Sequence, residues 1–285
     1  MINLFFPILM GLVISCAQSV AQSTEDKEHI SKEFSLPNSA NASVLAIYNI
    51  NGFIKVEGTS GSKVAFEVDK RMTAKTADVL EAGRKEFKLQ FEQKGDTVFA
   101  YIIEPFDSRP NRNRERNIRV DYDFTLDFTV KIPKEMNIVV STINRGDVTV
   151  TDVAGALKVS NINGAIKMTN ARGKTEARTI NGNVDANYPA TPPDQSSYYT
   201  LNGNINVTYP ANLSADLRFK TFQGEFYTDY PEATMLPVEV TKNKEQKGDK
   251  TVYKLDKSTA VRIGNGGKTL RFETFNGNVY IKKQS

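Results

Sequence analysis

The sequence predicts an all-β fold, a β-solenoid or β-helix-like stack of repeat sheets with one short helix in its N-terminal part. The first observation is a glycine every nine residues, at positions 146, 155, 164, 173 and 182. The second is an Asn before alternate glycines, as in Asn163-Gly164 and Asn181-Gly182, which makes the full coil 18 residues and two strands long. The third is the composition, which contains no Trp but is rich in Tyr, Phe, Val and Thr, the residues that pack well in sheets.

Each nine-residue block is predicted to be one short strand and one bend. Apolar residues lie two and four positions after each glycine, as Val148 and Val150 do, and side chains two apart share one face of a strand. Another lies seven positions after the glycine, where the alternation breaks and a corner is expected. The predicted core residues are Val148, Val150, Leu157, Val159, Ile162, Ile166, Met168, Ile180 and Val184. The predicted exposed residues are Thr149, Lys158, Lys167, Glu176 and Asp185.

Later copies of the unit are 21 residues long, and copies at 49–58 and 274–283 place the repeat near both ends of the chain. A unit this short cannot bury its own apolar face, so neighbouring units must stack. In a solenoid, equivalent residues of successive coils form columns, whereas in a meander successive strands pair antiparallel. The two-strand alternation favours the solenoid. Its stacked amides would hydrogen-bond along a column, and the members of this column would be Asn163, Asn181, Asn202 and Asn276.

The first 21 residues are predicted to be a signal peptide. The apolar run at 4–15 is too short to span a bilayer, and small residues at 19–21 precede Gln22 as they do at a cleavage site. An alternative is a bacterial lipoprotein, because residues 13–16 resemble a lipobox and end in Cys16, the only cysteine. In that case Cys16 would become the lipidated first residue.

We expect residues 24–135 to form an N-terminal β cap with one helix, and residues 136–285 to form the β-repeat body. The repeat copy at 49–52 indicates that the cap continues the same sheets. The spacing of apolar residues predicts the helix at 72–88. Strands are predicted at 43–48, 63–69, 88–92, 97–103, 118–132, 236–242 and 250–256.

A strand ending in V-K-I-P at 130–133 is followed by G-D-V-T-V, G-A-L-K-V, N-G-A-I-K-M and N-G-N-V. This run resembles the bacterial "putative adhesin" families, secreted β-solenoid-like proteins related to the head (GIN) domain of auto-transporter adhesins. The resemblance is strongest over about 130–210 and extends over 44–283, as repeat-based resemblances do. It implies an exported envelope protein with a binding role, and it implies no catalytic residue.

Neither composition nor motifs point to catalysis, a metal or a cofactor. The net charge of +4 is too small to demand a nucleic-acid partner. The only histidine, His29, is expected to be an exposed tail residue. The repeat carboxylates fall in different columns, so they predict neither a calcium site nor an acid–base pair: Asp147, Asp152, Glu176 and Asp185.

We therefore expect a non-enzymatic protein with an adhesin-like binding or structural role. One alternative is an enzyme that acts on polysaccharide along the solenoid face, which would need two converging carboxylates. Another is an accessory partner of an envelope-sensing system. The expected partner is a glycan or another envelope protein. The expected location is the periplasm, the outer surface or the extracellular space, with membrane attachment only if Cys16 is lipidated.

Two sets of side chains are candidates for binding. Three Tyr-Pro pairs recur every 21 residues, which predicts one column of rings that either binds a ligand or stabilises the corners as a ladder. Its members are Tyr188, Tyr209 and Tyr230. A polar loop at 104–117 carries guanidinium groups, which suit phosphate and carboxylate unless the loop is simply solvated. The residues singled out there are Arg112, Arg114 and Arg116.

Overall fold

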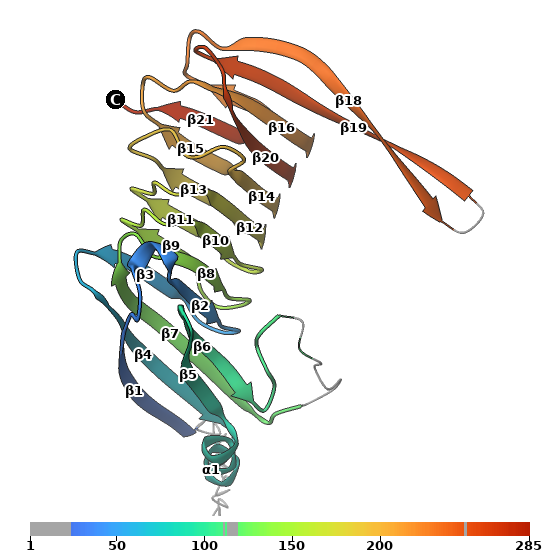
Figure 1. The fold of residues 1–285 in the computed structure, drawn as a ribbon. Coiled ribbons are helices and arrows are strands. Elements are labelled where there is room, and N and C mark those ends of the chain that lie inside the picture. Colours follow the sequence, from blue (N-terminus) through green and yellow to red (C-terminus); the bar gives the residue numbers. More distant parts are fainter. Residues whose placement is uncertain (1–23, 111, 113–118, 248–249) are drawn as a thin grey trace, which may run out of the picture.

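The computed structural model describes residues 24–110, 112, 119–247 and 250–285. The predicted signal peptide and Cys16 lie outside them. Two large sheets face each other along the whole length of the stack (Figure 1). The first sheet has 10 strands and the second has 11. The chain winds between the two sheets, and the side chains between them form one core.

The central coils form a parallel β-solenoid, as predicted, rather than an antiparallel meander. Each coil places one strand in each sheet and pairs it in parallel with the equivalent strand of the next coil. In the first sheet these strands are β9 (Val148–Thr151), β11 (Ile166–Thr169), β13 (Val184–Asn187) and β15 (Ile205–Tyr209). In the second sheet they are β8 (Asn137–Ser141), β10 (Leu157–Ser160), β12 (Thr175–Asn181) and β14 (Ser197–Asn202).

The N-terminal part continues both sheets. Strands β2 and β3 form a coil that pairs in parallel with β8 and β9 on one side and with β6 and β7 on the other. Antiparallel strands β1, β4 and β5 and a helix complete this end. The elements are β1 (Thr24–Ser35), a 3-10 turn (Ala40–Ala42), β2 (Val44–Tyr48), β3 (Ile54–Thr59), β4 (Lys63–Ala74), α1 (Ala77–Glu86), β5 (Lys88–Lys94), β6 (Thr97–Glu104) and β7 (Tyr122–Pro133). The division into a cap and a body at residue 135 stays a prediction.

The C-terminal coil does not stack in sequence order. After β15 the chain forms the outermost coil, projects as a long hairpin, and returns to insert its last coil beneath the outermost one (Figure 1). The inserted strands β20 and β21 pair with β14 and β15 below and with β16 and β17 above. These elements are β16 (Ala215–Gln223), β17 (Phe226–Thr228), the hairpin strands β18 (Thr234–Lys247) and β19 (Lys250–Ile263), β20 (Lys268–Asn276) and β21 (Val279–Lys283).

The predicted core is correct at the strand positions and wrong at one corner. Seven of the nine residues are buried, but Ile162 is 40% exposed and Ile180 is half-buried. The inward alternation continues into this corner through Asn161 and Thr179, which are buried, so the residue after each of them faces outward. Among the residues predicted to be exposed, Thr149 and Asp185 are half-buried and the three others are exposed.

The Asn-Gly corners are tight because successive glycines lie directly on one another. A Cβ at Gly182, whose φ is +157°, would lie 2.3 Å from the carbonyl oxygen of Gly164. No side chain fits into this space, and glycine also tolerates the backbone conformation. These contacts align the corners of all coils along one edge of the stack.

Three N-terminal and C-terminal segments differ from their predictions. The helix spans Ala77–Glu86, because residues 72–74 pair with β7 as strand and Thr76 caps the helix by accepting the amide proton of Val79. Residues 24–35 form strand β1 and are not a tail. The hairpin predicted at 236–242 and 250–256 is longer, with 14 residues in each strand.

Candidate binding surface

An outward-facing column of apolar side chains runs along the Asn-Gly edge of the solenoid. Its members directly precede the Asn, or in one case the Gln, of each tight corner. Backbone bonds join successive members: Asn144 N–H donates to Ile50 O over 2.7 Å, and Asn163 N–H donates to Ile143 O over 2.8 Å. Strand register carries the column to the last coil. We call this column the apolar stripe, and in spatial order it contains Ile50, Ile143, Ile162, Ile180, Leu201, Phe275 and Phe222.

The apolar stripe is open to solvent, most of all at its C-terminal end. Phe222 is 72% exposed and Phe275 is 44% exposed, and their rings stack with centroids 4.6 Å apart. Ile162 is also exposed, and the other four members are half-buried: Ile50, Ile143, Ile180 and Leu201. Single exposed apolar residues are ordinary on protein surfaces, but a contiguous apolar patch marks an interaction site. Seven aligned apolar positions therefore make this edge the candidate binding surface.

An amide ladder flanks the apolar stripe. Its members are Asn51, Asn144, Asn163, Asn181, Asn202 and Asn276. From Asn163 onward each side-chain Nδ2 donates to the Oδ1 of the preceding coil over 2.7 to 2.8 Å, and the Asn144–Asn51 pair is longer, at 3.4 Å. This confirms the predicted hydrogen-bonded asparagine column. An amide has two N–H donors and two acceptor lone pairs, so each inner Asn keeps one of each for a ligand.

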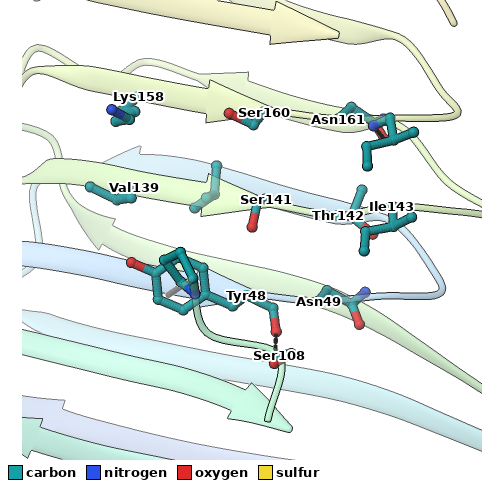
Figure 2. A pocket seen from close by; sticks show the side chains of 13 residues that line it. Tyr48, Asn49, Ser108, Val139, Ser141, Thr142, Ile143, Lys158, Ser160 and Asn161 are labelled. Atoms are coloured by element: carbon teal, nitrogen blue, oxygen red, sulfur yellow. Dashed lines mark hydrogen bonds between the residues drawn. The ribbon is translucent and has the colours of Figure 1, made fainter. Parts of the chain in front are cut away.

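A pocket opens beside the N-terminal half of the apolar stripe. Its volume is about 580 Å³, within the range of small-molecule sites. Ile143 and Ile162 of the stripe belong to its lining. The loop around Ser108 also lines it (Figure 2). Ser108 Oγ donates to the carbonyl oxygen of Tyr48 over 2.6 Å and so fixes this loop against β2. The pocket can therefore receive an apolar group that projects from a molecule lying on the stripe.

The side chains that line the pocket are uncharged except for that of Lys158. Lys158 lies on its wall and pairs with Glu176, with Nζ 3.3 Å from Oε2. Burial raises the pKa of the Tyr48 hydroxyl, although the charges of Lys158 and Arg109 oppose this shift. Tyr48 therefore stays a neutral hydroxyl at physiological pH, suited to hydrogen bonding rather than to general-base work.

The prediction that the tyrosine column could be a binding face is wrong, because its three rings lie in the core. Tyr188 and Tyr209 are fully buried and stack at 5.4 Å between centroids. Tyr230 is also buried, and its hydroxyl donates to the carbonyl oxygens of Tyr209 and Pro210 over 3.1 and 2.8 Å. The inserted C-terminal coil separates the coil of Tyr230 from that of Tyr209, so the equal spacing does not give one stack of three rings. Tyr188 and Tyr209 form a structural ladder, and Tyr230 joins it only through its hydroxyl.

The arginine loop is described only in part. Arg112 is exposed, with its Nε 4.0 Å from Asp107 Oδ2, whereas Arg114 and Arg116 lie outside the described residues. The neighbouring Arg109 is committed to the fold. It stacks on the Tyr101 ring at 3.9 Å, and its Nε donates to Asp107 Oδ1 over 3.0 Å. This bond holds the pKa of Asp107 below its usual value. An anion site at this loop stays a prediction.

His29 lies in an ordered strand and contacts two carboxylates. Its Nδ1 lies 2.7 Å from Asp69 Oδ1, and its Nε2 lies 2.8 Å from Glu67 Oε2, both on β4. The hydrogen bonds to Asp69 and then Glu67 raise the pKa of His29. The ring therefore ties β1 to β4. The three side chains lie on an exposed strand pair rather than in a cleft.

Within residues 24–110, 112, 119–247 and 250–285, no group of three or more His, Cys, Asp or Glu side chains is arranged to hold a metal ion. In the same residues no helix is both long and apolar enough to cross a bilayer.

The two-sheet parallel stack with its glycine corners defines a β-solenoid repeat protein. The chain belongs to the Toastrack DUF4097 family, whose model matches residues 124–282, more than half of the sequence. No curated protein matches the chain significantly.

Several solved structures are similar to this chain over most of its length. One is described as a "putative cell adhesion protein" from Clostridium sporogenes; the identity is 10%, the TM-score is 0.43, and the match covers 91% of this chain and 100% of that one. A "putative adhesin" from Bacteroides fragilis has 12% identity and a TM-score of 0.33, and the match covers 90% of this chain and 97% of that one. A "putative lipid binding protein" from Parabacteroides distasonis has 10% identity and a TM-score of 0.27, and the match covers 90% of this chain and 97% of that one.

Sequence reasoning missed the apolar stripe although its signal is present. An apolar residue precedes the Asn-Gly phrase in every copy, as Ile180 does before Asn181. Regular spacing alone predicts Ile162 and Ile180 in the core, because a regularly spaced apolar residue is usually buried. Continuing the alternation through the corner from Leu157 and Val159 would have placed Ile162 on the outside.

Proposed function

We propose that this protein is an exported, non-catalytic envelope protein with an adhesin-like role, and that it binds a partner protein along the apolar stripe. The single observation that carries the proposal is the alignment of seven outward apolar side chains, one from each tight corner, from Ile50 to Phe222. In the isolated chain these outward apolar residues keep part of their surface in water. A partner that covers them removes this apolar area from water, at about 25 cal/mol per Å².

The surface suits binding rather than catalysis. The stripe offers contact area, and the amide ladder offers one free donor and one free acceptor at each inner coil. The apolar stripe is long and repeats one position in every coil. Export is supported by the predicted signal peptide at 1–21, with the lipid anchor at Cys16 as its alternative.

The composition of the stripe favours a protein over a glycan. Sugar rings stack on exposed aromatic rings, but five of the seven stripe residues are aliphatic. Aliphatic side chains flanked by amides resemble the centre of a protein–protein interface, where apolar contacts lie within a polar rim. The pocket beside Ile143 and Ile162 can then anchor one large side chain of the partner.

Charged substitutions in the middle of the stripe test this proposal. Ile162→Asp and Ile180→Asp place a carboxylate on the stripe at positions that are not fully buried. Thr169→Asp is the matched control, because Thr169 is exposed at the opposite end of the same coil. The immobilised mature chain and its variants are compared for the envelope proteins they retain, quantified by mass spectrometry. We expect a protein retained by the wild type and by Thr169→Asp but lost with both stripe variants.

A glycan array on the same proteins separates the competing outcome. Glycan binding that disappears with Ile162→Asp would replace the protein partner with a sugar ligand. Release of reducing ends from the bound glycan would contradict a non-catalytic role. Retention of the same proteins by all four chains would show that the apolar stripe is not the binding surface.

A further inference from the structure

The outermost coil of the solenoid is formed by β16 and β17. Part of its outer edge has no paired strand in the described part of the chain. At each inner Asn-Gly corner the glycine donates its N–H to the next coil, as Gly203 does to Asn276 O and Gly277 does to Gln223 O, both over 2.9 Å. The residue two positions later does the same, as Val279 does to Glu225 O over 2.9 Å. The next donors in this series are the N–H groups of Gly224 and Phe226. No strand beyond β17 accepts them within the described part of the chain.

The side chains of this coil are also uncovered. In four inner coils a threonine before the corner is buried and donates to a glycine carbonyl, as Thr200 does to Gly182 and Thr274 does to Gly203. The equivalent Thr221 is exposed. Phe222, the most exposed member of the apolar stripe, lies beside it. The outermost coil therefore presents the upper half of a coil–coil joint.

The other three sheet edges are protected by charge. Strand β1 at the far edge of the first sheet reads TEDKEHISKEFS, and the edge strands of the second sheet read KLQFEQK and TMLPVEVTKNKEQK. Charged residues on edge strands prevent pairing with other chains. The three residues of β17 read FYT and carry no charge, although Lys220 and Glu225 lie in the same coil. Strand β17 is therefore the least charged of the four edge strands.

The chain itself shows what fits on such an edge. Its last coil, β20 and β21, is delivered from beyond the β18–β19 hairpin and still stacks on both neighbours with full register. The joint on this edge therefore forms between segments that are not consecutive in the sequence. A second copy of this chain carries the same open edge.

We propose that residues 220–228 form a self-association surface, on which two copies join end to end through their outermost coils. A two-fold axis perpendicular to the stack makes the paired edges antiparallel, and it lets each edge satisfy the open donors of the other. Phe222, Thr221 and Phe226 become covered in the dimer. This proposal shares Phe222 with the apolar stripe, but it does not rest on the partner proposed for the stripe.

Sedimentation velocity and light scattering of the full mature chain over a range of concentrations test the dimer. We expect the mass to double as concentration rises. Phe222→Glu and Thr221→Glu should each abolish this doubling, because both add a charge to the open edge at exposed positions. Phe53→Glu is the matched control: Phe53 is 38% exposed at a tight corner in the N-terminal part, and the doubling should persist. Circular dichroism and thermal melting show that each variant is folded.

Hydrogen–deuterium exchange gives the second readout. The amides of Gly224 and Phe226 should exchange quickly in dilute protein and become protected in concentrated protein, whereas that of Gly277 should not change. A chain that stays monomeric at every concentration overturns the proposal, as does a dimer that survives both Glu substitutions. Ile162→Asp should leave the dimer intact, so failure of the stripe as a binding surface and failure of the dimer remain distinguishable.

Discussion

The ring of Tyr188 stacks on the ring of Tyr209 at 5.4 Å, with an angle of 27° between the planes, in the core of the solenoid. The Tyr209 hydroxyl donates to that of Tyr198 over 3.3 Å, and the Tyr188 hydroxyl donates to Thr175 over 2.6 Å. Burial raises the pKa of Tyr188 to about 12, so the phenol stays neutral. Two coils are therefore joined by ring stacking and by satisfied buried hydroxyls.

Replacing one of these rings should destabilise the fold strongly. We expect Tyr209→Ala to lower the free energy of unfolding by about 3–5 kcal/mol, as large aromatic truncations in cores do. Tyr227→Ala is the control, because Tyr227 is 44% exposed and stacks only on Tyr280 at the surface. It should cost less than about 1 kcal/mol. Urea unfolding followed by circular dichroism measures both, and equal costs would contradict the ladder.

The two faces of one strand and corner give a second test. Ile166→Ala removes a fully buried side chain of β11 and should cost about 2–5 kcal/mol. Ile162→Ala removes an outward side chain four residues earlier and should cost less than about 1 kcal/mol. The same unfolding measurement compares them. A larger loss for Ile162 than for Ile166 would show that the corner register is reversed.

The pairing of strand β1 with β4 should weaken as pH rises. The carboxylates of Asp69 and Glu67 raise the pKa of His29 in the folded protein, so the protonated ring stabilises the β1–β4 pairing. This contribution is complete below the unfolded pKa of about 6.5 and is lost as pH rises through the higher folded value. Amide exchange of β1, corrected for intrinsic rates, should accelerate over this range. His29→Gln should remove the pH dependence, and an unchanged profile in that variant would contradict it.

The mature chain should begin at Gln22. Small residues at 19–21 form the expected cleavage site, and removal of the segment before it leaves a chain without cysteine. Intact-mass spectrometry of the native protein measures the terminus directly. A diacylglyceryl group on Cys16 would instead establish the lipoprotein alternative and a membrane anchor.

The repeat unit could be predicted from the sequence, but the order of its copies could not. Gly164, Gly182 and Gly203 predict corner spacing because the close approach of stacked backbones excludes every other residue. The same phrase at Gly224 and Gly277 does not reveal which coil lies outermost. Every coil presents the same donors and acceptors to its neighbour, so the sequence is equally compatible with either order. The structure places the coil of Gly277 beneath that of Gly224.

The candidate surface was harder to predict for a related reason. Spacing identifies residues that share a column, but it does not say whether the column faces the core or the solvent. Tyr188 and Tyr209 share a column and are buried, whereas Ile162 and Ile180 share a column and face outward. The difference depends on the strand alternation: Tyr188 continues the inward positions of Val184 and Ala186, whereas Ile162 follows the inward Asn161. His29 was missed because its polar strand is held by β4, which lies far away in sequence.

Photo-crosslinking from the apolar stripe tests the central claim most directly. A photoreactive amino acid replaces Ile162 in one protein and Thr169, at the opposite end of the same coil, in another. Both proteins are expressed in the producing cells and irradiated there. We predict a crosslink from position 162 to one protein partner, and none to that partner from position 169. Equal crosslinking from both positions, or none from position 162, would contradict a partner bound along the stripe.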